Sequence, residues 1–351
     1  MSRDKFFYTD SCDTLYHSMI RSDRLSLLIL GMLLTFIPAI FYGCQKSVLP
    51  IVPPSPTETC TSVRLKGAGP LDGSTFDILT FEDDRLRRLD SYQRVEDIMD
   101  NRAYISSTGG KKIFFFCSDS QRNRYSWTGI ASYSSLGKLF CDIENENPHS
   151  PVITGECRAY AGESCNITLH PLLSSITLKA ICCDFSGTPY AQSTIRDVKV
   201  YLTNVSATCP IIQPEALSPS RIINTGMLNR YDMARFKHPE IISRHVTKEL
   251  GRETIWPEIQ LMCYPNPKTD NPADLPTRLV VEGKINSETY YWPIEIGEKG
   301  KGVSWNSHYI YDIFIRRKGV SDPDISVTPQ QMEINMNVKP WKEIEEYIVP
   351  F

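Results

Sequence analysis

Beyond residue 60, hydrophobic and polar residues mostly alternate with a period of two. The clearest run lies near the C-terminus, where Met332, Ile334, Met336 and Val338 alternate with polar residues. A strand with one buried face gives this pattern, because successive side chains point to opposite faces of a sheet. Other runs rich in β-branched and aromatic residues also predict strands, at residues 61–66, 77–81, 113–117, 175–185, 197–205, 277–285, 289–296 and 308–317.

Helical spacing is confined to two short segments, residues 133–144 and 241–250, which we expect to cross the surface between strands. A strand-rich chain with occasional short helices predicts an all-β fold built from β-sandwiches. Prolines interrupt the alternation between residues 207 and 220, which indicates a domain junction. We therefore predict two tandem β-sandwich domains, at residues 60–206 and 207–351.

The N-terminus has the order of a secretory signal. An uncharged apolar run, residues 25–42, follows Arg21 and Arg24 and ends at Gly43, directly before Cys44. The run is slightly shorter than the roughly 20 residues of a membrane-spanning helix, so a signal anchor is the second interpretation. We predict that residues 1–43 are a signal peptide, with Met19 as an alternative start.

Residues 41–44 resemble a bacterial lipobox, in which a peptidase cuts before the cysteine and the thiol carries lipid. The resemblance implies cleavage between Gly43 and Cys44 and acylation of Cys44. Residues 44–59 are rich in proline and predict an extended tether that follows the lipid. Each buried methylene contributes about 0.8 kcal/mol of membrane affinity, so a multiply acylated cysteine would hold the protein on a membrane.

Composition narrows the class of protein. Hydrophobic residues make up 41% and charged residues 23%, as in ordinary folded proteins. The net charge of -3 gives no basic footprint, so we expect no nucleic-acid partner.

The cysteines do not form an obvious framework. Eleven are present, of which Cys12 lies in the leader and Cys44 is the lipidation candidate, leaving an odd number. No C-x-x-C occurs, and Cys182 and Cys183 should point to opposite faces of a strand. We expect most of the others to be small buried hydrophobic residues, with a pairing that the sequence does not determine.

Motifs of catalysis are weak. The sequence has no H-E-x-x-H and no G-x-S-x-G, and Ser135 and Lys138 form an S-x-x-K without its usual companions. Asp322 and Asp324 flank a proline and are too few for a calcium loop, and residues 107–112 predict a turn between strands. We therefore expect no catalytic residue, no metal and no cofactor, while an enzyme site assembled from distant residues stays open.

The order of several phrases resembles the fimbrillin-type pilus lipoproteins of Bacteroidales. In the C-terminal half these are TRLVVEGKI, TYYWPIEI, a W-N-x-x-Y, a G-x-x-DPD turn and a last strand ending in Lys339-Pro340-Trp341. In the N-terminal half DILTF, LDSY, HPLL and the strand at 197–205 agree. The resemblance implies two transthyretin-like sandwiches in a fimbrial subunit that is lipid-anchored at the outer membrane and joined to other subunits by strand exchange.

Cleavage after an arginine is also implied by the resemblance, and Arg64 lies where such a cut would fall. Uncut, the chain would be an anchor or accessory subunit; cut, it would reach the shaft or tip. The final residues, 347–351, are compatible with strand donation. A surface adhesin for host glycans or proteins is the alternative, and its candidate contact residues are Trp127, Trp256, Trp292 and Trp305.

Overall fold

The computed structural model describes residues 59–66, 75–96, 98, 100–118, 127–213, 219–269, 271, 274–297, 301–328 and 331–340. The chain divides into two compact units, residues 1–55 and 56–351, and every described residue belongs to the second. The predicted signal peptide, Gly43 and Cys44 lie outside the described residues, as does the C-terminal tail from Trp341. Among the helices that are described, none has the length and apolar character needed to span a membrane.

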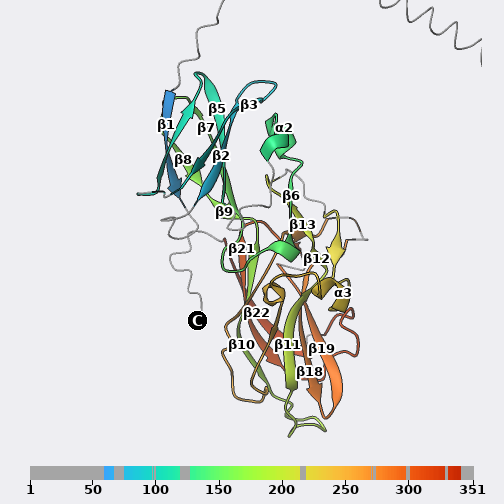
Figure 1. Ribbon diagram of the computed structural model, residues 1–351. Coiled ribbons are helices and arrows are strands. Elements are labelled where there is room, and N and C mark those ends of the chain that lie inside the picture. Colours follow the sequence, from blue (N-terminus) through green and yellow to red (C-terminus); the bar gives the residue numbers. More distant parts are fainter. Residues whose placement is uncertain are drawn as a thin grey trace, which may run out of the picture. The chain divides into compact units, whose positions relative to one another are not determined.

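Two sheets, of three and five strands, form the first sandwich (Figure 1). The three-stranded sheet has the order β4 (Arg102–Ser107), β1 (Thr59–Lys66) and β8 (Cys165–Thr168). The five-stranded sheet has the order β3 (Leu89–Val95), β2 (Phe76–Glu82), β5 (Lys111–Ser118), β7 (Ile153–Tyr160) and β9 (His170–Pro171).

The interior strands β2 and β5 of the five-stranded sheet are buried on both faces. Phe114 and Phe116 of β5 belong to the cluster between the two sheets, whereas Ile113 and Phe115 pack into a second cluster that includes Leu136. This explains why β5 is a continuous hydrophobic run and does not alternate.

Two four-stranded sheets form the second sandwich. One has the order β16 (Ile259–Cys263), β10 (Ser174–Cys183), β21 (Ser307–Ile315) and β22 (Met332–Pro340). The other has the order β15 (Ser243–His245), β11 (Arg196–Thr203), β18 (Arg278–Ile285) and β19 (Glu288–Glu295). Their inner residues, among them Leu178, Val200 and Trp292, share one core. The predicted all-β class with sandwiches is confirmed.

Strand pairing crosses the predicted junction between residues 206 and 207. Strands β10 and β11 precede it, but β10 pairs with β16 and β21, and β11 pairs with β15 and β18. By their hydrogen bonds, residues 174–203 therefore belong with the C-terminal half. The prolines after residue 207 lie in and after a short strand, β13, which ends at Pro210 and pairs with β6.

Short elements complete the described chain. The strands form pairs in β6 (Phe140–Asp142) with β13 (Thr208–Pro210), β12 (Val205–Ser206) with β14 (Ile222–Ile223), and β17 (Asn266–Pro267) with β20 (Gly302–Val303). The helical turns are η1 (Trp127–Gly129), α2 (Tyr133–Leu136), η2 (Ile143–Asn145), α3 (Arg230–Met233) and η3 (Pro239–Ile241).

Both predicted helices are wrong over most of their length. In the first, α2 ends at Leu136 with Gly137 as its C-cap, and the chain then forms β6. In the second, η3 ends at Ile241 and residues 243–245 form β15, which pairs with β11. Tertiary strand pairing outweighs helical spacing in both segments.

Turn predictions agree better with the structure. Residues 286 and 287, between β18 and β19, both have positive φ, at 56° for Asn286 and 107° for Ser287. Two such residues close a tight hairpin whose twist matches that of the flanking strands. The segment at 107–112 is likewise a turn, between β4 and β5.

Candidate strand-exchange site

Strand β1 is the central strand of its sheet and the first described segment of the chain (Figure 1). It pairs antiparallel with β4, from Thr59 opposite Ser107 to Arg64 opposite Arg102. It pairs parallel with β8, from Val63 opposite Cys165 onward. An N-terminal strand held between two others, without a hairpin to either, can be exchanged for another strand without threading the rest of the chain.

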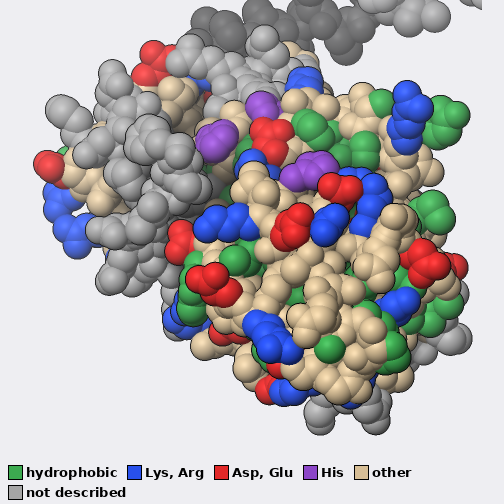
Figure 2. Space-filling model, turned by 90° about the horizontal axis from the view of Figure 1, so that it is seen from below, with side chains coloured by type: hydrophobic (Ala, Val, Ile, Leu, Met, Phe, Trp, Pro, Cys, Tyr) green, Lys and Arg blue, Asp and Glu red, His purple; other side chains and the backbone are tan. Residues whose placement is uncertain are grey.

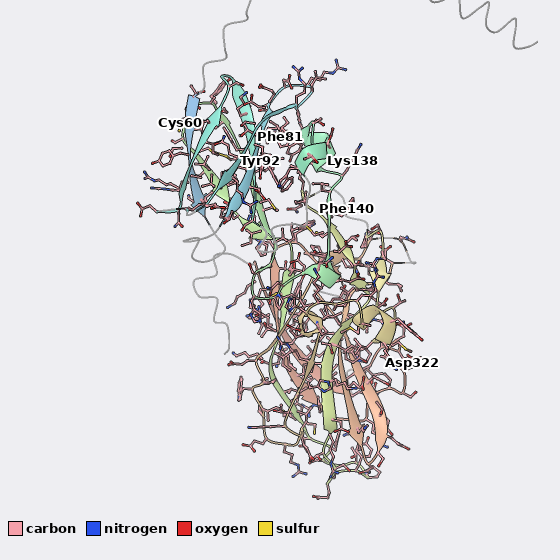
Figure 3. All side chains as sticks on the ribbon, in the orientation of Figure 1. Cys60, Phe81, Tyr92, Lys138, Phe140 and Asp322 are labelled. Atoms are coloured by element: carbon pink, nitrogen blue, oxygen red, sulfur yellow. A yellow bond between two sulfur atoms is a disulfide. The ribbon has the colours of Figure 1, made fainter. Side chains whose placement is uncertain are left out.

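Alternation decides which side chains of β1 enter the core. Thr61, Val63 and Leu65 are almost fully buried in the first sandwich, while Cys60 and Arg64 are exposed. Cys60 lies near the start of the strand, at the outer side of the sheet (Figure 3). Burial of a side chain such as Val63 stabilises the folded state by about 1.5 to 3 kcal/mol. The inward-facing side chains therefore contribute much of the free energy that keeps β1 in its sheet.

Hydrogen bonds from outside the ladder also fix β1. The Gly162 N–H donates to Thr61 Oγ1 at 2.9 Å, and Thr59 Oγ1 donates to the Ser107 carbonyl at 3.2 Å. The hydroxyl oxygen of the buried Thr61 therefore accepts a hydrogen bond. A strand that replaced β1 would keep this hydrogen bond only if it carried an acceptor at this position.

Arg64 marks a division within β1. All six residues paired with β4, Thr59 to Arg64, precede the peptide bond that follows Arg64. Leu65 and Lys66, which come after that bond, pair with β8, and the Leu65 N–H also donates to the Asn101 carbonyl, directly before β4, at 2.8 Å. A cut after Arg64 would thus release the whole β1–β4 ladder and leave β4 with an unpaired edge. The surface that residues 59–64 cover between β4 and β8 is called the β1 slot below.

A disulfide ties β8 to the opposite sheet. Cys157 of β7 bonds to Cys165 of β8, so it joins the five-stranded sheet to the three-stranded one. Among the described strands β8 pairs with β1 alone, so the disulfide is a second, covalent connection that keeps β8 in place. Nothing in the sequence beyond the number of cysteines indicates this pairing.

Replacing both cysteines, as Cys157→Ser with Cys165→Ser, should lower the free energy of unfolding by about 2 kcal/mol, because the unfolded chain regains loop entropy. Urea denaturation measures the change. A reducing agent should lower the stability of the unsubstituted protein by a similar amount and leave the double variant unchanged. Equal stability of the unsubstituted protein in oxidising and reducing buffer would contradict the disulfide.

Most of the remaining described cysteines are buried, as predicted. Of the described cysteines outside the disulfide, Cys60 is exposed and six are buried, namely Cys117, Cys141, Cys182, Cys183, Cys209 and Cys263. Burial raises the pKa of the Cys183 thiol to about 11, so that thiol stays protonated at neutral pH. These residues behave as the small hydrophobic side chains that the sequence analysis predicted.

A buried ion cluster lies where the β4–β5 turn enters the first sandwich. Lys112 of β5 is fully buried, and its Nζ lies 2.7 Å from Glu82 Oε1, 3.2 Å from Asp90 Oδ2 and 2.7 Å from Thr108 Oγ1. Thr108 in turn donates to Asp90 through its N–H, at 3.0 Å, and its hydroxyl. The cluster joins β2, β3 and β5 to the turn that follows β4.

Asp90 stays ionised in this cluster. Burial acts to raise the pKa of its carboxyl, but the two hydrogen bonds from Thr108 and the Lys112 ammonium outweigh it and lower that pKa. No sequence motif marked Lys112, which follows the exposed Lys111 in an ordinary strand.

The candidate catalytic and calcium-binding residues, all of which are described, do not come together in a site. Ser135 Oγ lies 3.0 Å from Ser132 Oγ at the start of α2, and Lys138 is exposed beyond the end of that helix (Figure 3). Asp322 accepts the Asp324 N–H at 2.9 Å in a surface turn, and Asp324 pairs with Arg278 at 3.0 Å. No group of three metal-ligating side chains comes together among the described residues.

Of the four candidate tryptophans, one is strongly exposed. Trp256 is 61% exposed and Lys179 Nζ lies 5.7 Å from its ring centroid. Trp292 is fully buried in the second sandwich, and Trp127 and Trp305 are partly buried against the same core. The face of the protein in Figure 2 carries acidic and basic side chains interspersed, with hydrophobic groups in separate small areas.

The last described strand, β22, forms an edge of its sheet. It pairs with β21 on one side only, and its apolar row is partly exposed, at 37% for Ile334 and 39% for Val338. An edge strand with incompletely covered apolar side chains offers backbone groups to another strand. The predicted donor residues, 347–351, lie outside the described residues.

Comparisons with known proteins identify the fold through structure alone. No model of a known protein family matches the sequence, and no curated protein matches it. A solved structure of a protein proposed to act in cell adhesion, from Bacteroides eggerthii, is 12% identical, covers 81% of this chain and 96% of its own, and has a TM-score of 0.59. A similar protein from Parabacteroides distasonis is 14% identical, covers 83% and 99%, and has a TM-score of 0.57.

A fimbrilin from Porphyromonas gingivalis has the same architecture. It is 12% identical, the match covers 82% of this chain and 98% of the fimbrilin, and the TM-score is 0.58. The described part of this chain therefore has the fold of fimbrilin and of these adhesion proteins from Bacteroidales. At such low identity the agreement concerns the fold.

Proposed function

We propose that this chain is a structural subunit of a cell-surface fimbrium, which joins its neighbours by strand addition at the β1 slot. One observation carries the proposal: the β1 residues that pair with β4, Thr59 to Arg64, all lie before the peptide bond that follows Arg64, so a single cut there would empty the slot. An emptied slot leaves a row of unpaired backbone groups and a buried apolar row without cover, which an extended segment of another subunit can satisfy. The fold shared with fimbrilin supports this function.

Export and delivery form the second part of the proposal. The signal peptide is cut between Gly43 and Cys44, the thiol of Cys44 is acylated, and the lipid holds the precursor at the outer membrane with the prolines of residues 44–59 as tether. Cleavage after Arg64 then removes lipid, tether and β1 residues together. The subunit is thereby transferred from the membrane to the fimbrium.

The side chain of Arg64 is exposed, but its backbone is paired on both sides. A protease binds an extended, unpaired segment, so β1 must open locally before the cut. Opening starts most easily at a strand end. We place the cut in the precursor, before any partner strand is bound.

The experiment compares two basic residues on the same face of β1. Arg64→Gln should leave a precursor that begins at lipidated Cys44 and is absent from sheared surface fimbriae. Lys66→Gln, two residues further on, should be cut and incorporated normally. Mass spectrometry of the membrane and fimbrial fractions reads both outcomes. Normal incorporation of Arg64→Gln would remove the cut from the mechanism.

An adhesin is the second candidate, and Trp256 is the observation that favours it. An exposed indole face with a lysine beside it is a surface on which a sugar ring or an aromatic side chain can stack. If this is the function, Trp256→Ala should abolish binding to a glycan array without changing incorporation into fimbriae.

A further inference from the structure

The outer face of the β1 slot carries an unfavourable charge pair. Arg64 of β1 lies directly opposite Arg102 of β4, and both side chains are exposed on the same face of the sheet. Residues directly opposite in an antiparallel pair have Cβ atoms about 4.5 to 5.5 Å apart, and like charges at that separation destabilise the pairing. Within the described part of the chain, no acidic side chain forms an ion pair with either guanidinium.

The other neighbour of position 64 is also a hydrogen-bond donor. In the parallel pairing of β1 with β8, Arg64 lies opposite Asn166, which is exposed. Position 64 is therefore flanked by the guanidinium of Arg102 and the amide of Asn166. A carboxylate at this position could accept hydrogen bonds from both groups, whereas the resident arginine can donate to the Asn166 amide oxygen but can accept nothing from Arg102.

The inner face of the slot sets two more requirements. Position 61 is fully buried and accepts the hydrogen bond of the Gly162 N–H through the Thr61 hydroxyl, which favours a hydroxyl residue there. Position 63 is fully buried and filled by a β-branched side chain, Val63. The slot thus selects a hydroxyl residue, a β-branched residue two positions later, and then the residue that faces Arg102.

We infer that the natural occupant of the β1 slot is a strand of another subunit with the order hydroxyl, any residue, β-branched, acidic. The inference rests on the proposed function and names the chemistry of its partner. Arg64 then has two effects. It is the residue that the protease recognises, and it is also the residue that pairs poorly with Arg102. The resident strand is consequently a weaker occupant than the strand that replaces it.

Two synthetic peptides test the inference. The first has residues 57–64 with Cys60→Ser, and the second has Arg64→Glu in addition. The mature chain beginning at Leu65 is refolded with a fluorescent form of the first peptide, and displacement by each unlabelled peptide is measured. The glutamate peptide should bind about fivefold more tightly, and the difference should shrink at high salt because the pair is exposed.

Variants of Arg102 provide matched controls. Arg102→Glu should reverse the preference, so that the arginine peptide binds more tightly, and Arg102→Gln should remove most of it. Equal affinity of both peptides for the unsubstituted chain would overturn the inference and leave strand addition standing. If neither peptide binds, both the proposed function and the inference are overturned.

Discussion

Replacement of Lys112 by methionine should lower the free energy of unfolding by about 3 to 5 kcal/mol at neutral pH, because it leaves the buried Asp90 carboxylate without its cation. The Lys112 ammonium is fully buried between Glu82 and Asp90, and methionine preserves most of the volume of the side chain. Urea denaturation of the purified chain measures the loss. The expected change is a large fraction of the stability of an ordinary domain.

A neighbouring residue supplies the control. Lys111 pairs with Asp83 at 3.0 Å but is 48% exposed, so Lys111→Met should cost at most about 1 kcal/mol. A Lys112→Met variant as stable as Lys111→Met would show that the cluster is not buried in solution.

The pH dependence follows from the same cluster. In the unsubstituted protein the pKa of Asp90 is lowered, so its contribution to stability is present above the unfolded pKa and is lost as the pH falls through the folded one. Without Lys112 the pKa of the buried Asp90 should rise, which reverses the sign. The deficit of the methionine variant should therefore decrease toward acidic pH.

Introducing an aspartate at position 63 should destabilise the precursor by about 4 kcal/mol or more, since it buries an unpaired charge. Val63 is fully buried between the two sheets of the first sandwich. The same substitution should have no effect on subunits that have been cut after Arg64, because position 63 has then left the protein. Thermal unfolding of the uncut and the cut chain separates the two cases.

The outward neighbour is the matched control here. Ser62→Asp places the same charge on the partly exposed face of β1 and should change the stability of the precursor little. A Val63→Asp variant that weakens the cut subunit as much as the precursor would mean that β1 is retained after processing.

The strands were predictable where hydrophobic and polar residues alternate, even in β22, whose apolar row is partly exposed at the edge of its sheet. Residues 332–339 alternate strictly, and β22 covers Met332–Pro340. The strand predicted at 277–285 corresponds to β18, at Arg278–Ile285. Local alternation carries this information because it depends only on which face of the strand meets the core.

The helices and the sheet partners were not predictable for the opposite reason. Residues 243–245 form β15 because β11 lies alongside, and residues 140–142 form β6 because β13 does. Neither partner is close in sequence, so a window of neighbouring residues contains no sign of it. The predicted junction at residue 207 stays a prediction, and the sequence gives no sign that strands on its two sides pair, as β10 does in parallel with β21 more than a hundred residues later.

The candidate site was predictable only in part. Arg64 was predicted from a resemblance and the structure places it in β1, but its position opposite Arg102 depends on a register that the sequence does not contain. The disulfide between Cys157 and Cys165 and the buried Lys112 cluster were not predicted, because both depend on which strands face each other.

The mature N-terminus of the chain in assembled surface fimbriae tests the central claim most directly. Fimbriae are sheared from the cell surface, and the first residue of this subunit is determined by mass spectrometry. We expect an unmodified chain that begins at Leu65. An assembled subunit that still begins at lipidated Cys44, or an unprocessed chain that begins at Met1 or Met19, would contradict it.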